Sequence, residues 1–208
     1  MWYRNWLSRL AAHRLGMALL AAMLILVPSM EAVSSDEGAG GTPLAPSRVS
    51  GKFLLLDHFG EPVTDRSFGD RFQLIYFGYT NCPDVCPSAM VTMNQALAQM
   101  GPKAERVQPL MISVDPERDT PAVLREYVSY FHPRLVGLTG TPEMIERVTQ
   151  NFRIRYEKVR LPDDPPGVYR MDHSAGIYFM GPGGRFLVKF AYSATAEQMA
   201  QRMLDFIP

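Results

Sequence analysis

The sequence predicts an α/β fold with a central mixed sheet, because short apolar runs alternate with helical segments. Residues 72–77 and 107–114 are mostly apolar, which is typical of parallel strands that are covered on both faces. Later in the chain, a Gly-Pro-Gly-Gly stretch at residues 181–184 separates two further apolar segments. A short glycine-rich connection of this kind predicts a hairpin, which would add an antiparallel edge to the sheet.

The other elements follow from the same patterns. Strands are expected where short runs are rich in branched or aromatic residues, at residues 52–57, 72–77, 107–114, 135–138, 177–180 and 186–190. Helices are expected at residues 86–100, 120–131, 141–151 and 195–207. Thr120 and Thr141 each precede a proline, a pattern typical of a helix N-cap followed by proline in the first turn. A turn is expected at residues 60–62, where Gly-Glu-Pro follows the first strand.

This order of elements predicts a thioredoxin-like three-layer fold. The order is strand, helix, strand, helix, and then a hairpin and a last helix. The early parallel strands require crossover helices, whereas the hairpin supplies the antiparallel edge. We therefore expect one thioredoxin-like domain over residues 48–208.

The N-terminal segment predicts a membrane anchor. Residues 1–14 contain arginines and no acidic residue, and an apolar run occupies residues 15–30. This pattern favours a transmembrane signal-anchor, with residues 1–14 in the cytoplasm and the domain on the exported side. Residues 31–47 are rich in Ser, Gly, Pro and Ala, and predict a flexible linker. The expected location is a bacterial inner membrane with the domain in the periplasm, or an exported soluble form if the anchor is cleaved.

The charge balance argues against nucleic-acid binding. The chain has 21 acidic and 21 basic residues. Nucleic-acid binding requires clustered basic residues, and no such cluster occurs in the expected domain.

The chain has only two cysteines, Cys82 and Cys86, placed between an expected strand and an expected helix. A helix N-terminus favours the thiolate, which binds soft metals and attacks disulfides. Spacing of i and i+4 would place both sulfurs on one helix face, where they could converge. A purely structural disulfide over so short a loop would constrain the unfolded chain little. Three intervening residues suit a metal at least as well as thiol–disulfide exchange, and both readings stay open.

A metal site would need a third ligand, and His173 is the best candidate among the domain's histidines. It lies between a Pro/Gly-rich loop and the expected hairpin, a segment that returns beside the cysteine helix in a thioredoxin-like fold. His58 and His132 are interpreted as turn or surface residues. Two thiolates and one imidazole favour Cu(I), and an added weak ligand admits Cu(II). Zinc is the rival metal, but structural zinc usually has four protein ligands and only three candidates are in evidence here.

Three ordered motifs resemble the Sco/SenC family of membrane-anchored, thioredoxin-like copper proteins. The motifs are YFGYTNCPDVCP at residues 76–87, SVDPERDTP at residues 113–121 and DHSA at residues 172–175. By this resemblance, Cys82, Cys86 and His173 are the copper ligands. Asn81 stands where the family often has His, and the loop at residues 161–168 is individual to this chain.

The resemblance also implies a role in copper delivery. The expected acceptor is the copper A centre in the copper-bearing subunit of cytochrome c oxidase, or another cuproprotein, and the expected donor is a periplasmic copper protein. The alternative is a thiol–disulfide oxidoreductase that uses Cys82 and Cys86 as a redox-active pair to reduce the acceptor's cysteines. Asp172 is a candidate to orient His173 or to add a distant oxygen, although it could equally cap a turn. Asp115 is interpreted as local turn chemistry with Pro116.

Overall fold

The computed structural model describes residues 49–160, 162 and 164–208. The predicted basic segment 1–14, the anchor 15–30 and the linker 31–47 lie outside the described residues. Within the described part of the chain, no helix has both the length and the apolar character needed to cross a membrane.

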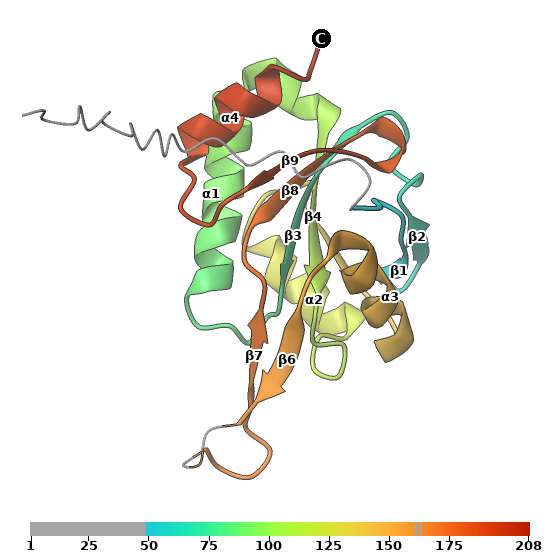
Figure 1. Ribbon diagram of the computed structural model, residues 1–208, viewed down its shortest axis with the longest axis vertical. Helices are drawn as coiled ribbons and strands as arrows, with labels where there is room; N and C mark the ends of the chain where they lie inside the picture. Colours follow the sequence, from blue (N-terminus) through green and yellow to red (C-terminus); the bar gives the residue numbers. More distant parts are fainter. Residues whose placement is uncertain (1–48, 161, 163) are drawn as a thin grey trace, which may run out of the picture. The chain divides into compact units, whose positions relative to one another are not determined.

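A seven-stranded mixed sheet forms the centre of the domain, in the order β2-β1-β5-β4-β3-β8-β9 (Figure 1). The central strands β3, β4 and β5 pair in parallel, and the other neighbours pair antiparallel. This arrangement confirms the predicted α/β fold with a mixed sheet. The strands of this sheet are β1 (Leu54–Asp57), β2 (Pro62–Thr64), β3 (Phe72–Gly78), β4 (Val107–Ser113), β5 (Val136–Thr139), β8 (Ile177–Gly181) and β9 (Arg185–Phe190).

Helices cover both faces of the sheet. Tyr76 and Phe77 are neighbours in β3, so their side chains point to opposite faces. Tyr76 contacts Cys86 of α1 on one face, and the ring of Phe77 packs on Phe152 of α3 on the other. The helices are α1 (Val85–Gln99), α2 (Pro121–Ser129), α3 (Pro142–Phe152) and α4 (Ala196–Leu204), with short 3₁₀ helices at η1 (Gly101–Arg106) and η2 (Pro182–Gly184).

The threonine caps explain where three helices begin. The side chains of Thr120, Thr141 and Thr195 each accept a hydrogen bond from a backbone N–H in the first turn of α2, α3 and α4. This contact satisfies a donor that the helix itself cannot pair. The predicted caps at Thr120 and Thr141 are therefore confirmed.

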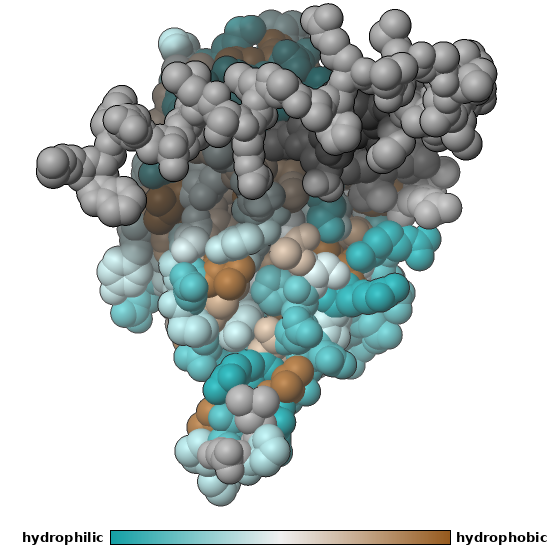
Figure 2. Space-filling model, turned by 60° about the vertical axis from the view of Figure 1, so that its left-hand side comes forward, coloured by the Kyte–Doolittle hydropathy of each residue, from teal (hydrophilic) through white to brown (hydrophobic). Residues whose placement is uncertain are grey.

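Two features of the fold differ from the sequence-based expectation. The predicted turn at residues 60–62 ends in a short strand, β2, which pairs with β1. In addition, β6 (Tyr156–Val159) and β7 (Arg170–His173) form a separate two-stranded hairpin. Figures 1 and 2 show this hairpin projecting from the rest of the domain. Its strands are short and carry charged residues at their exposed positions, such as Glu157, Lys158 and Asp172, so they lack the apolar run that revealed the other strands.

Candidate metal centre

Cys86 lies in the first turn of α1 and is fully buried. The hydroxyl of Tyr76 donates to its sulfur at 3.4 Å, and the backbone N–H of Tyr79 donates to it as well. Burial raises the pKa of the Cys86 thiol to about 12 in spite of these two donors. In the folded chain without a metal, the Cys86 thiol therefore keeps its proton at neutral pH.

Cys82 lies in the turn between β3 and α1 and is partly exposed. The backbone N–H of Cys86 donates to its sulfur at 3.4 Å, and the N–H groups of Asp84 and Val85 donate to it too. Burial opposes ionisation, but these donors outweigh it and lower the pKa of the Cys82 thiol below its ordinary value. The predicted effect of a helix N-terminus is thus confirmed for Cys82.

The expected i, i+4 placement of both cysteines on one helix face is wrong. The helix begins at Val85, so only Cys86 belongs to it. Cys82 reaches the same place because the turn folds back over the first turn of α1, where its sulfur meets the free N–H groups. Both cysteines are free thiols.

His173 ends β7 and points toward the buried thiol. Its Nε2 lies 4.0 Å from the Cys86 sulfur, and its Nδ1 lies 3.2 Å from the backbone oxygen of Ser174. A carbonyl can only accept, so Nδ1 carries the ring proton and Nε2 presents a lone pair to the sulfur. Burial lowers the pKa of His173, although the Ser174 carbonyl and Asp172 oppose this. The imidazole is therefore neutral at neutral pH, as a metal ligand must be.

Two tyrosine rings hold the imidazole from its sides. The rings of Tyr76 and Tyr79 meet that of His173 edge-on, with centroids 6.2 and 6.1 Å away. Within the described residues, no three His, Cys, Asp or Glu side chains form a ready-made metal site. However, ligands about 2.3 Å (sulfur) and about 2.0 Å (nitrogen) from one metal ion can be up to about 4.3 Å apart. The separation of Cys86 and His173 is within that reach.

The other candidates named from the sequence occupy different positions. His58 and His132 each accept a hydrogen bond from a nearby backbone N–H, those of Gly137 and Arg134. Asp172, one candidate to orient His173, is exposed on β7, and the Nδ1 of His173 contacts the Ser174 carbonyl instead. The structure therefore gives no support to an orienting role for Asp172.

Asp115 does more than cap a turn. It is almost fully buried, and its carboxylate accepts a hydrogen bond from the hydroxyl of Tyr169 at 2.8 Å and forms an ion pair with Arg118. Asp119, which the sequence reasoning missed, is fully buried and accepts three hydrogen bonds. The only signal for these two residues was an acidic motif directly after a buried strand.

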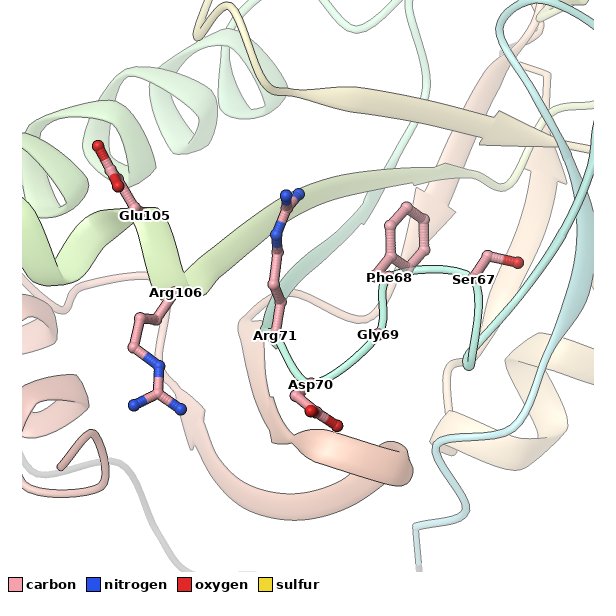
Figure 3. Close-up of a pocket in the computed structure, with 7 residues that line it drawn as sticks. All are labelled: Ser67, Phe68, Gly69, Asp70, Arg71, Glu105 and Arg106. Atoms are coloured by element: carbon pink, nitrogen blue, oxygen red, sulfur yellow. The ribbon is translucent and has the colours of Figure 1, made fainter.

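Cavities lie at both ends of the central strands. One of about 360 Å³ opens beside His173 and is lined by residues of both strands of the projecting hairpin. Another, of about 450 Å³, is lined by charged side chains such as Asp70, Arg71 and Arg106 (Figure 3). Arg71 and Arg106 precede β3 and β4, so this second cavity is at the opposite end of the strands from the cysteines. It is not part of the candidate centre.

Gly78 makes room for the buried thiol, and we expect Gly78→Ala to destabilise the domain. A Cβ added there would lie 2.6 Å from Tyr76 Cε1 and 2.9 Å from the Cys86 sulfur. Forced contacts in a packed core cost about 1–3 kcal/mol. Denaturant unfolding should show this loss, whereas Gly181→Ala, whose Cβ would meet nothing closer than 3.4 Å, should change little. Equal stability of the two variants would contradict this account.

These observations define a thioredoxin-like α/β protein with a dithiol and an imidazole at the end of its central strand. The SCO1/SenC family model matches residues 41–207, and the chain belongs to this family. Protein SenC of Rhodobacter capsulatus is 36% identical over 199 residues, which cover 92% of this chain and 89% of that protein.

Mitochondrial relatives are longer than this chain. The SCO2 homolog of Mus musculus is 40% identical over 153 residues, which cover 73% of this chain and 59% of that protein. The SCO1 homolog of Homo sapiens is 35% identical over 198 residues, covering 94% and 64%. The chain thus spans less than two thirds of the length of both relatives.

Solved structures of similar proteins contain copper. The structure of Bradyrhizobium japonicum ScoI with copper bound is 43% identical, with a TM-score of 0.69, and the match covers 76% of this chain and 99% of that one. Yeast Sco1 with copper bound is 34% identical, with a TM-score of 0.68, covering 76% and 87%. The match to these structures supports the thioredoxin-like fold that the sequence predicts.

Proposed function

We propose that this chain binds copper through Cys82, Cys86 and His173, and delivers it to the copper A centre of cytochrome c oxidase. The observation that carries the proposal is the approach of the His173 Nε2 to within 4.0 Å of the Cys86 sulfur, beside the Cys82 sulfur at the start of α1. Family membership and the copper-bound structures of similar proteins support the choice of metal.

The donor set fits a soft ion. Two sulfurs and one neutral imidazole are the ligands that Cu(I) prefers. Binding would remove the thiol protons, and the surroundings can stabilise the resulting charge. Tyr76 already donates to the Cys86 sulfur. The buried hydroxyl of Tyr127 has no hydrogen-bond partner within the described structure. Its pKa is raised by burial and then by the charges of Cys86 and Cys82, so it lies within electrostatic reach of both sulfurs.

The placement of the three ligands suits a protein that passes its metal on. The two sulfurs are fixed by the start of α1, whereas His173 belongs to a hairpin outside the main sheet. We propose that copper is released by stepwise ligand exchange and that His173 leaves first. The acceptor would be a copper-bearing oxidase subunit or another cuproprotein, and the donor a periplasmic copper protein.

The proposed cellular setting follows from the N-terminal sequence. Residues 15–30 would anchor the chain in a bacterial inner membrane, and residues 31–47 would tether the domain on the periplasmic side. This arrangement would place the copper-binding domain on the same side of the membrane as an exported copper centre.

The test is metal analysis of the reduced full-length chain, combined with X-ray absorption at the copper edge. We expect one Cu(I) per chain with two sulfurs and one nitrogen as ligands. His173→Ala should remove the nitrogen and weaken binding. His132→Ala is the matched control, because the His132 ring accepts a hydrogen bond from the backbone N–H of Arg134, whose side chain contacts the start of β4 at the opposite end of the strands from the cysteines. A wild-type affinity and spectrum for His173→Ala would disprove the three-ligand site.

A thiol–disulfide oxidoreductase is the second candidate, and the unequal thiols favour it. Cys82 is partly exposed with a lowered pKa, whereas Cys86 is buried with a raised one. The Cys82 thiolate would attack an acceptor's disulfide and release one acceptor thiolate. Cys86, after losing its proton, would then displace the second, leaving a Cys82–Cys86 disulfide. Transfer of two electrons to an oxidised acceptor without copper, together with the reduction potential, would test this role.

A further inference from the structure

The five residues Asp115–Asp119, here called the post-β4 loop, contact both halves of the candidate metal centre. The loop begins two residues after the end of β4, whose neighbour β3 leads to the cysteines. Its side chains reach the turn that carries Cys82 and the hairpin that carries His173.

Asp119 binds the cysteine side of the centre. Its carboxylate accepts hydrogen bonds from the Thr80 backbone N–H at 3.0 Å and from the Thr80 hydroxyl at 2.6 Å. The hydroxyl of Ser113 donates to the same carboxylate at 2.6 Å. Thr80 comes two residues before Cys82, and Asp119 is fully buried. These bonds tie the start of the cysteine turn to the end of β4.

Arg118 and Asp115 bind the histidine side. The Arg118 guanidinium lies 3.7 Å from the centre of the Tyr169 ring and donates to the Tyr169 carbonyl at 3.0 Å. The Tyr169 hydroxyl donates to Asp115, which also pairs with Arg118. Tyr169 directly precedes β7, the strand that ends at His173. The loop therefore contacts Tyr169 through its ring, its hydroxyl and its carbonyl, directly before β7 begins.

Tyr79 connects the two sides. Its ring contacts the His173 ring edge-on and lies 5.7 Å from the Arg118 guanidinium. Its hydroxyl accepts a hydrogen bond from the backbone N–H of Met171 in β7. Arg118 thus touches both the hairpin and a residue at the end of β3.

We propose that the post-β4 loop is a two-sided positioning clamp that sets the distance between His173 and the two thiols. Asp119 positions the cysteine turn, and Arg118 with Asp115 positions the hairpin. None of these residues is a metal ligand in this scheme. The proposal rests on the proposed function only in that the clamped groups share a metal, and the clamp itself is testable without copper.

The test uses the metal-free, reduced full-length chain and two variants. Tyr169→Phe keeps the ring over Arg118 but loses the hydrogen bond to Asp115, and Asp119→Asn keeps the side-chain shape but loses one acceptor. One readout is amide hydrogen exchange in β6 and β7, and the other is amide hydrogen exchange at Thr80 and Cys86, whose N–H groups bond Asp119 and the Cys82 sulfur. We expect Tyr169→Phe to speed hairpin exchange about tenfold, since buried bonds to charged groups are strong. Exchange at Thr80 and Cys86 should stay unchanged.

Asp119→Asn should give the opposite pattern. Loosening the turn weakens the bond from the Thr80 N–H to residue 119 and the bond from the Cys86 N–H to the Cys82 sulfur, so exchange at these two amides should speed up about tenfold. Hairpin exchange should stay within about twofold of wild type, because Asp119 does not contact the hairpin directly. If Asp119→Asn fails to fold, Ser113→Ala removes one of the three donors and provides a milder variant with the same expected direction.

Glu117→Gln is the control within the same loop. Glu117 pairs with Lys158 of β6 at the surface, and exposed ion pairs contribute little, so neither readout should move. The clamp is disproved if Tyr169→Phe and Asp119→Asn each change both readouts. It is also disproved if Tyr169→Phe leaves the hairpin readout unchanged and Asp119→Asn leaves the cysteine-turn readout unchanged. Copper titration of the same wild-type sample tests the proposed function separately, because the two variants can each change a different readout even if the chain binds no Cu(I).

Discussion

Cys86→Ser is expected to lower the Cu(I) affinity of the reduced chain by at least about a hundredfold. This loss exceeds the typical effect of removing a group that only orients a metal ligand. Cys86 is the central residue of the candidate centre, since its N–H contacts the Cys82 sulfur and its own sulfur faces His173. A serine hydroxyl does not ionise at neutral pH and is a hard ligand, whereas Cu(I) prefers thiolate. Competition with a chromophoric Cu(I) chelator under anaerobic conditions would measure the change.

A control in the same helix separates ligand loss from damage to the core. Met90 lies one turn after Cys86 in α1 and is 1% exposed in the core. Met90→Leu keeps the volume and removes a sulfur, so the Cu(I) affinity should stay within about twofold of wild type. If Cys86→Ser also binds Cu(I) as tightly as wild type, Cys86 is not a ligand.

The buried parts of the fold were predictable because burial leaves a mark on composition. Strands β3 and β4 are buried along their whole length and were placed to within one residue. The hairpin of β6 and β7 was missed because its short strands carry charged residues at their exposed positions, and because Arg118 connects it to the post-β4 loop from a distant part of the sequence. Such contacts between distant segments leave no periodic pattern.

The candidate ligands were predictable, but their surroundings were not. Spacing and residue type indicated Cys82, Cys86 and His173. The hydrogen bond from His173 to the Ser174 carbonyl depends on backbone geometry, which no side-chain pattern encodes. Likewise, the role of Tyr76 beside Cys86 appears only when α1 packs on β3. A tyrosine in a buried strand would otherwise be assigned to packing.

The two thiols are expected to react at very different rates in the native, reduced chain. Cys82 has a pKa below the ordinary thiol value, whereas burial raises that of Cys86 to about 12. At pH 7 the thiolate fraction of Cys82 should therefore exceed that of Cys86 by at least about a thousandfold. A thiolate of lower pKa is a weaker nucleophile, which reduces the rate ratio to at least about thirtyfold before burial is counted.

The pH dependence of the two alkylation rates distinguishes a difference in thiol pKa from simple steric shielding of Cys86. The Cys82 alkylation rate should rise with pH, with a midpoint below pH 9, the value from which its pKa is lowered. The Cys86 rate should keep rising toward its pKa of about 12. Mass spectrometry of chains labelled briefly with iodoacetamide would assign each site, and denaturant should make the two rates nearly equal. Equal labelling of both thiols in the native chain would contradict the unequal environments. That outcome would also remove the observation that favours the oxidoreductase role.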